Sequence, residues 1–72
     1  MPEVRAELVG SVWKVEVQAG DRVEEDDTLV ILESMKMEIP VVAPIAGVVR
    51  EVLVKPEDVV KEGQVLVVVE AA

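Results

Sequence analysis

Apolar residues alternate with polar ones in some segments of this chain and form short unbroken runs in others. Residues 12–18 largely alternate, as expected of a strand with one buried face, and residues 49–55 repeat that alternation less cleanly. Residues 29–32 and 65–69 are continuous apolar runs, which indicate strands buried on both faces. Valine dominates these segments and favours strands, whereas the four prolines oppose helices. The pattern therefore predicts an all-β fold without helices.

The chain also contains an internal repeat with a period of 37 residues. When residues 4–33 are placed on residues 41–70, 12 of the 30 aligned positions are identical, including Gly10 with Gly47. The abundance of valine explains part of this agreement, but it does not explain the matching glycine, aspartate and glutamate positions. We interpret the repeat as two copies of one supersecondary unit, each too small to bury its own apolar face.

The repeat predicts how the strands assemble. Turn-like residues lie at Gly20-Asp21 and at residues 56–58, and they divide each copy into short strands. We expect each copy to form a four-stranded unit, and the two units to pack face to face as a flattened β-barrel or sandwich. Residues 34–38 join the first copy to the second. Because the same position in the second copy is the end of the chain, the termini should lie at the opposite end of the molecule from Lys36.

Length and composition narrow the possible functions. The 72 residues are enough for a single domain, residues 1–72, and leave no room for a catalytic domain around a binding site. The formal net charge of -8 argues against nucleic-acid binding, because phosphates would be repelled by an acidic surface. Without cysteine or histidine, the chain has no thiolate or imidazole for a nucleophilic pair or a metal site. We therefore expect a non-catalytic protein without a metal.

The sequence shows no targeting signal, and this bears on the expected location. No charged-then-apolar leader opens the sequence, and no apolar run approaches the length needed to cross a membrane. We expect a cytoplasmic protein without a membrane partner. The compact start and finish of the sequence favour a whole protein over an excised domain.

One short segment combines residues that can carry chemistry. Lys36 stands between Met35 and Met37 at the connection between the two copies. A lysine amine is a nucleophile once it is deprotonated, and a projecting turn would present it to the active site of another protein. Methionine is flexible and suits a surface that must fit several partners. Most lysines in turns are simply solvated, so composition and spacing alone leave an ordinary surface role for Lys36 open.

The residues around this lysine resemble a known attachment motif. Residues 33–37 read Glu-Ser-Met-Lys-Met and resemble the Glu-Ala-Met-Lys-Met motif of the biotinyl/lipoyl carrier family. Residues 17–23 resemble the upstream segment of that family, and residues 42–49 resemble its downstream Ala-Pro-x-x-Gly-x-Val segment. The similarity covers essentially the whole chain. In particular, the chain resembles small stand-alone biotin/lipoyl attachment proteins. It implies a barrel-sandwich hybrid with the lysine on the hairpin between the two halves.

The resemblance implies that the chain is a biotin carboxyl carrier. Biotin protein ligase would join biotin to Lys36 by an amide bond. Met35 and Met37 would be the flanking recognition residues, and Glu33 and Ser34 would complete the motif. The arm would carry a carboxyl group from a biotin carboxylase to a carboxyltransferase. Lysine and the biotin chain together give about ten bonds and a reach of about 10–15 Å, so the protein would supply a tether rather than catalysis.

Two other functions stay open. A lipoyl carrier with lipoate on Lys36 would have the same fold, but lipoyl motifs commonly read Asp-Lys-Ala or Asp-Lys-Val, and both neighbours of this lysine are methionine. An unmodified structural or interaction module needs no lysine motif, so this sequence disfavours it.

The chain departs from the family pattern at several positions. Ser34 replaces the commoner alanine, and residues 18–28 are too few for the protruding thumb of some carriers. Asp26 and Glu57 stand where the family often has glycine, so we expect these two turns to differ. Trp13, the only aromatic residue, is expected to cover the barrel, with a partner-facing anchor as the alternative.

Overall fold

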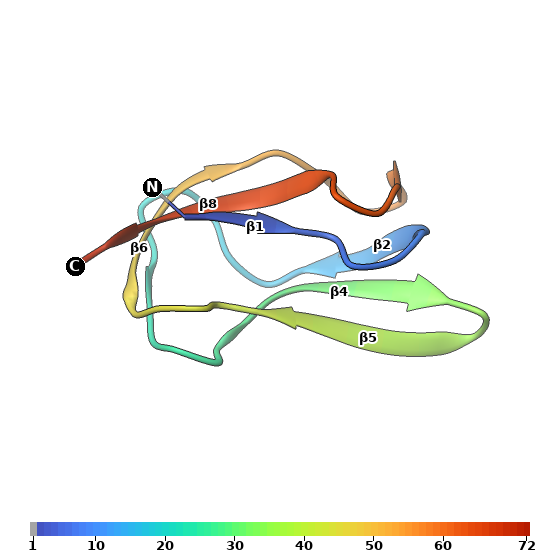
Figure 1. Ribbon diagram of the computed structural model, residues 1–72, viewed down its shortest axis with the longest axis horizontal. Helices are drawn as coiled ribbons and strands as arrows, with labels where there is room; N and C mark the ends of the chain where they lie inside the picture. The colour runs from blue at the N-terminus through green and yellow to red at the C-terminus, as the bar shows by residue number, and fades with distance from the viewer. Residues whose placement is uncertain (1) are drawn as a thin grey trace.

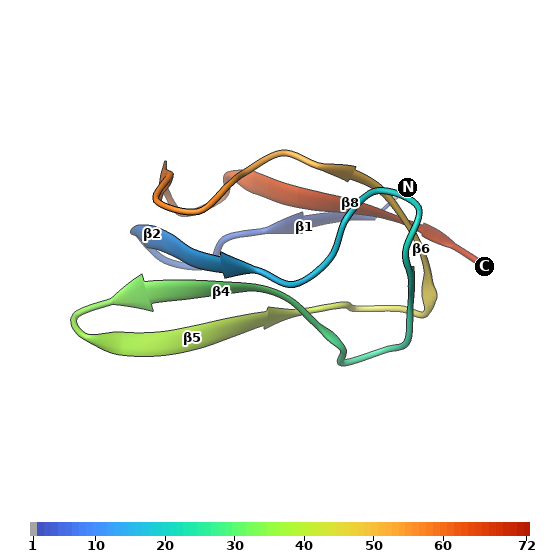
Figure 2. The same ribbon diagram turned by 180° about the vertical axis from the view of Figure 1, so that it is seen from behind.

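A computed structural model describes residues 2–72, and every regular element in them is a β-strand. The molecule is elongated, with extents of 35 × 17 × 17 Å, and Figures 1 and 2 show its strands in two layers. In chain order, the strands are β1 (Glu3–Arg5), β2 (Gly10–Val15), β3 (Arg22–Val23), β4 (Thr28–Ser34), β5 (Met37–Val42), β6 (Gly47–Val52), β7 (Val59–Val60) and β8 (Val65–Ala71). The all-β prediction is confirmed. None of the described residues forms a helix that is long and apolar enough to span a membrane.

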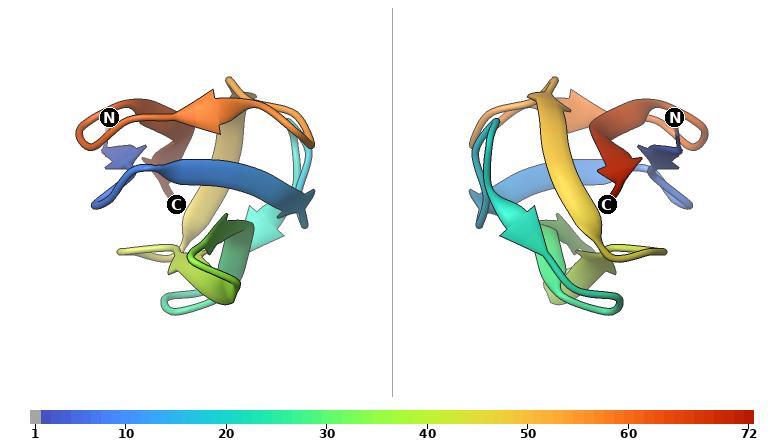
Figure 3. Two further views of the ribbon diagram at one scale, coloured as in Figure 1. Left: turned by 90° about the vertical axis from the view of Figure 1, so that its right-hand side faces the viewer. Right: turned by 90° about the vertical axis from the view of Figure 1, so that its left-hand side faces the viewer.

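Each of the two sheets takes strands from both copies of the repeat. One sheet has the strand order β1-β8-β6-β3 and the other has the order β5-β4-β2-β7. Because the repeat relates β1–β4 to β5–β8 in turn, a shift of 37 residues converts the first sheet into the second. The two sheets close around one interior when the molecule is viewed along its long axis (Figure 3). The two four-stranded copies are therefore interleaved, and neither copy forms a sheet of its own.

Backbone hydrogen bonds join the two copies in equivalent pairs. The Gly20 N–H donates to the Val49 carbonyl at 2.8 Å, and the Glu57 N–H donates to the Val12 carbonyl at 2.8 Å. These two bonds are related by the repeat, since both donors and acceptors are 37 residues apart. A turn of each copy is thus fastened to a strand of the other, and one copy alone would leave these backbone groups unpaired.

The core lies between the two sheets and is built from equivalent residues of both copies. Leu29 and Leu66, which the repeat aligns, are both completely buried. The apolar runs at residues 29–32 and 65–69 are buried almost throughout, as the sequence predicts. No polar or charged side chain in residues 2–72 is buried. Apolar burial, the dominant favourable term in folding, therefore comes from both copies together.

Two turns in each copy place a residue in left-handed backbone. Gly20 (φ 98°) corresponds to Glu57 (φ 79°), and Asp26 (φ 74°) corresponds to Gly63 (φ 87°). Glycine adopts this conformation freely, whereas other residues do so at a cost of about 1–2 kcal/mol. The expectation that the Asp26 and Glu57 turns would differ is wrong. Both keep the glycine-type backbone, and each donates its N–H to a carbonyl of the other copy at 2.8 Å, Asp26 to Ala43 and Glu57 to Val12.

The β4–β5 hairpin and the chain ends lie at opposite ends of the long axis (Figure 1). The start of β1 and the end of β8 lie together at one end, and the turn between β4 and β5 forms the other. This arrangement confirms the placement of Lys36 away from the termini. The turn that carries this lysine therefore projects into open space.

Candidate functional site

Lys36 lies in a two-residue turn at the tip of the β4–β5 hairpin. Ser34 pairs with Met37 in the antiparallel register, so only Met35 and Lys36 form the loop. Both have positive φ, 53° for Met35 and 64° for Lys36, as a type I′ turn requires. Such turns favour Asn-Gly, and a non-glycine residue in this backbone stores about 1–3 kcal/mol of strain. Strain of this kind clusters at functional sites, so the turn is the first candidate in the molecule.

The turn projects its side chains into solvent. Met35 is 89% exposed and Met37 is 59% exposed, although methionine is usually a core residue. Lys36 is exposed as well, and no carboxylate in residues 2–72 forms an ion pair with its ammonium group. The amine is therefore free to enter the active site of another protein. That protein would supply the base that removes the proton of the amine.

Two carboxylates face each other below the turn. Glu33 on β4 lies directly opposite Glu38 on β5, and both side chains are exposed. Like charges at opposed positions of neighbouring strands repel each other. Within residues 2–72, neither carboxylate is part of an ion pair. The face below the lysine is therefore acidic and complementary to a basic surface on a partner.

The strands below the turn are anchored in the core. Leu32 is only 1% exposed and pairs with Ile39, which is partly buried. Ser34 follows on the same face of β4 and is partly exposed, so its hydroxyl group can be solvated in place of the family's alanine. A turn supported by two anchored strands holds the backbone of Lys36 in one orientation, which a partner enzyme can recognise.

The residue at a bulge in β2, next to this hairpin, breaks the internal symmetry. In the second copy, Arg50 lies at a bulge in β6 with its Nη1 3.5 Å from Glu70 Oε1. The equivalent bulge in β2 holds Trp13, and Glu33 takes the place of Glu70. Trp13 is 48% exposed and lines a shallow depression together with Glu33. The structure therefore favours the outward-facing alternative for Trp13 over a cover for the barrel.

The other lysines have different surroundings. Lys14 in β2 lies 3.4 Å from Glu16, and Lys55 after β6 lies 3.7 Å from Asp58. Lys61 follows β7, and its backbone N–H donates to the side chain of Gln64. Lys36 alone lies at the tip of a two-residue hairpin between two exposed methionines.

The acidic residues do not gather into a metal site. In residues 2–72, no group of three or more His, Cys, Asp or Glu side chains is placed to hold a metal ion. Within the acidic run at residues 24–27, the Asp27 carboxylate accepts a hydrogen bond of 2.8 Å from the Glu24 N–H. This carboxylate therefore stabilises its own turn.

Comparison with known proteins places these features in a family. The family model described as biotin-requiring enzyme matches residues 1–71. The chain is 52% identical over 63 residues to a biotin/lipoyl attachment protein of Bacillus subtilis (strain 168), which covers 88% of this chain and 86% of that protein. It is 51% identical over 67 residues to the biotinylated protein TB7.3 homolog of Mycobacterium leprae (strain TN), and the alignment covers 93% of this chain and 94% of that protein. The chain belongs to the biotin/lipoyl attachment family.

A solved structure shows the same fold inside a large enzyme. The crystal structure of the Kluyveromyces lactis urea carboxylase matches with a TM-score of 0.91 and 35% identity, over 96% of this chain and 6% of that chain. The family and fold predicted from the sequence are confirmed. The chain is a biotin-attachment domain, a carrier rather than a catalytic unit, and biotin is its favoured group. The assignment of Lys36 and its neighbours as the attachment site stays a prediction.

Proposed function

We propose that this protein acts as a biotin carboxyl carrier, a single domain of residues 1–72 in which biotin protein ligase attaches biotin to Lys36. The observation that carries the proposal is the position of Lys36, exposed and without an ion pair in a strained two-residue turn. A chain of this family with one such lysine offers one natural point of attachment. The proposal also assigns the protein to the cytoplasm, as its sequence suggests.

Attachment is an acyl transfer to the lysine amine. The deprotonated Nζ attacks an activated carboxyl group of biotin held by the ligase, an amide bond forms, and the activating group leaves with the electrons of the bond that breaks. The residues present fit this chemistry, since the amine has no ion pair to break in residues 2–72. Met35 and Met37 flank the amine as adaptable apolar contacts.

Recognition by the ligase would involve the faces of the hairpin beside the lysine. Glu33 offers a carboxylate on the outer face, and Ser34 offers a small side chain on the inner face. Small size at position 34 matters, because a bulky residue there would crowd Met37 across the pair. These residues would position the turn in the active site of the ligase, and they take no part in bond formation.

The chain itself contributes a tether. Attached biotin supplies a ureido nitrogen that can carry a carboxyl group. The hairpin holds this group at the end of the long axis, away from the termini (Figure 1). Once the carrier has bound a partner enzyme, the tethered group meets the active site at an effective concentration on the order of mM.

A biotin carboxylase and a carboxyltransferase are the proposed partners. The support is the fold match to part of a urea carboxylase, a carboxylase by name, at 35% identity. The acidic face of Glu33 and Glu38 would suit basic surfaces around the active sites of such enzymes.

Lipoate on Lys36 is the second candidate. It is supported by the relative from Bacillus subtilis, whose name includes both biotin and lipoyl attachment. The two methionines beside Lys36 favour biotin, because lipoyl motifs commonly have aspartate before the lysine and a small residue after it.

The proposal is tested by labelling the carrier. The chain is loaded with biotin by a biotin protein ligase and incubated with a biotin carboxylase, ATP and labelled bicarbonate. We expect label on the protein, and none on the Lys36→Arg variant, which keeps the positive charge but accepts no biotin. Label on both proteins, or loading with lipoate but not with biotin, would contradict the proposal.

A further inference from the structure

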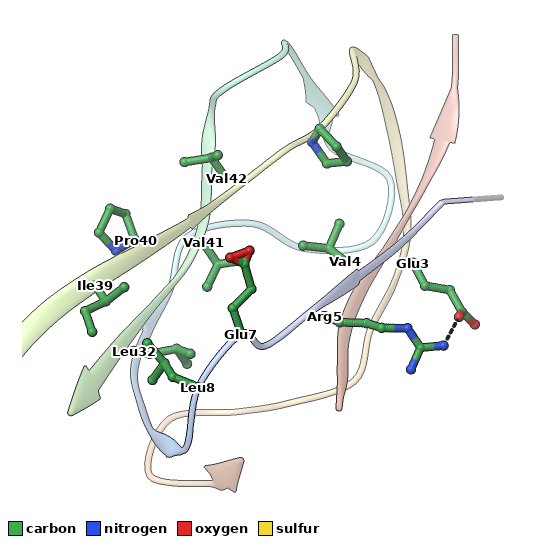
Figure 4. Close-up of a pocket in the computed structure, with 11 residues that line it drawn as sticks. Glu3, Val4, Arg5, Glu7, Leu8, Leu32, Ile39, Pro40, Val41 and Val42 are labelled. Atoms are coloured by element: carbon green, nitrogen blue, oxygen red, sulfur yellow. Dashed lines mark hydrogen bonds and ion pairs between the residues drawn. The ribbon is translucent and has the colours of Figure 1, made fainter. Parts of the chain in front are cut away.

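A groove runs along the seam where the edges of the two sheets meet (Figure 4). Its sides are β1, the edge of one sheet, and β5, the edge of the other. The groove has a volume of about 360 Å³, and its apolar walls include Val4, Leu8, Leu32, Ile39, Val41 and Val42. This volume lies within the range of small-molecule sites, about 300–1,000 Å³.

One carboxylate stands over this apolar surface. Glu7 follows β1, and Figure 4 shows its side chain directed across the groove toward β5. Arg5 on the rim is already engaged, because it pairs with Glu3 and donates to the Gly63 carbonyl. No cation in residues 2–72 pairs with Glu7. Glu7 is not one of the residues that the two copies share, since Pro44 occupies the equivalent position of the second copy.

The groove begins within reach of Lys36. Leu32 and Ile39 form its near end, and Ile39 is three residues from Lys36 along β5. At ~3.4 Å per residue this separation is about 10 Å. A biotinylated lysine reaches about 10–15 Å, counted as about ten bonds of ~1.5 Å. A ring on the end of this arm can therefore reach the near end of the groove, at Leu32 and Ile39.

We propose that the groove holds the bicyclic ring of the biotin carried on Lys36 of the same chain, with the ureido N–H groups donating to the Glu7 carboxylate. The inference rests on the proposed attachment at Lys36. The hydrocarbon and thioether part of the ring matches the apolar walls, and the ureido edge offers two N–H donors to a carboxylate without a cation. Because tethering gives an effective concentration on the order of mM, a weak site is still filled for much of the time.

Docking of the ring has two consequences for the carrier. The ring covers the apolar seam and the open edge of β5, which would otherwise be available to pair with another chain. Partner enzymes then compete with the groove for the ring. Lipoate has no N–H donors on its ring, so the Glu7 carboxylate selects biotin over lipoate as the docked group.

Amide NMR spectra of the unmodified and the biotinylated protein test the inference. Intact mass first establishes that biotin is attached, so that a failure of attachment is distinguished from a failure of docking. We expect amide shifts in residues 3–8 and 39–42, together with NOEs between ring protons and the methyl groups of Leu8, Ile39 and Val41. Shifts confined to residues 34–38, without these NOEs, would overturn the proposal.

Two further measurements test whether Glu7 is the hydrogen-bond acceptor and whether the ring in the groove belongs to the same chain. Glu7→Ala should move the groove resonances of the biotinylated protein back toward their unmodified positions. Glu25→Ala, which removes an exposed glutamate that does not line the groove, should leave them shifted. The shifts should not change on dilution, because docking is intramolecular. Shifts that disappear on dilution would mean that a second copy fills the groove and would contradict the proposal, as would a Glu7→Ala spectrum identical to that of the parent.

Discussion

Trp13 occupies, in the first copy of the repeat, the bulge position that Arg50 occupies in the second. Arg50 reaches Glu70, and Glu33 lies in the equivalent place near Trp13. We therefore expect Trp13→Arg to change the free energy of unfolding by no more than about 1 kcal/mol, the scale of an exposed ion pair. Urea denaturation measures this change. A loss of about 3–5 kcal/mol, as for a large core side chain, would show that Trp13 belongs to the core.

The left-handed backbone at Glu57 predicts a stabilising substitution. Its counterpart Gly20 adopts the same backbone without a steric penalty, and a Cβ added at Gly20 would meet nothing within 4 Å. Glu57→Gly should therefore raise the free energy of unfolding by about 0.5–1 kcal/mol, and Gly20→Glu should lower it by about 1–2 kcal/mol. Thermal denaturation checks both. The control is Glu62→Gly, at a nearby exposed residue without a positive φ, which should give no gain; an equal gain from it would refute the backbone explanation.

The strained turn predicts that a substitution at Met35 can stabilise the fold. Asparagine tolerates left-handed backbone better than methionine does, so Met35→Asn should stabilise the fold by about 0.5–1 kcal/mol. Met37→Asn should not, because Met37 begins β5 and asparagine is disfavoured in strands. Chemical denaturation of the two variants tests this difference. If Met35→Asn has no effect on stability, the turn stores no strain that side-chain identity can relieve.

The hairpin geometry predicts that the position of the lysine matters as much as its identity. Exchanging Met35 and Lys36 keeps the composition but moves the amine to a residue whose side chain leaves the turn in another direction. Misplacement of a reacting group by about 1 Å can cost ~100-fold in rate, so we expect the rate of biotin attachment to fall by about that factor. Met37→Leu, which nearly conserves volume, is the control and should have a modest effect. Equal rates for the exchanged and original chains would mean that the ligase reads local sequence rather than shape.

The sequence predicted the fold largely because of its repeat. The apolar runs at residues 29–32 and 65–69 identified the most buried strands, and the shift between the copies placed the lysine away from the termini. The interleaving of the copies could not be predicted in this way, because strand pairing across the sheets depends on contacts between distant residues. Strands as short as β3 and β7, with two residues each, also carry too little periodicity to be recognised.

Only part of the site could be predicted from the sequence. The motif around Lys36 was visible in the sequence, but its strained turn was not, since neither Met35 nor Lys36 is a residue that favours a type I′ turn. The relation of Trp13 to Arg50 was present in the repeat as a mismatch between aligned positions. Its meaning required the ion pair between Arg50 and Glu70, which only the structure shows.

Attachment of biotin to Lys36 is tested most directly by peptide mass mapping of the protein purified from cells that co-express a biotin protein ligase. We predict a single biotin, carried by the peptide that contains Lys36. We also predict that Lys36→Arg accepts none while its stability stays within about 0.5 kcal/mol of the parent, because the side chain is exposed. Biotin on Lys14, Lys55 or Lys61, or modification by lipoate alone, would contradict the assignment.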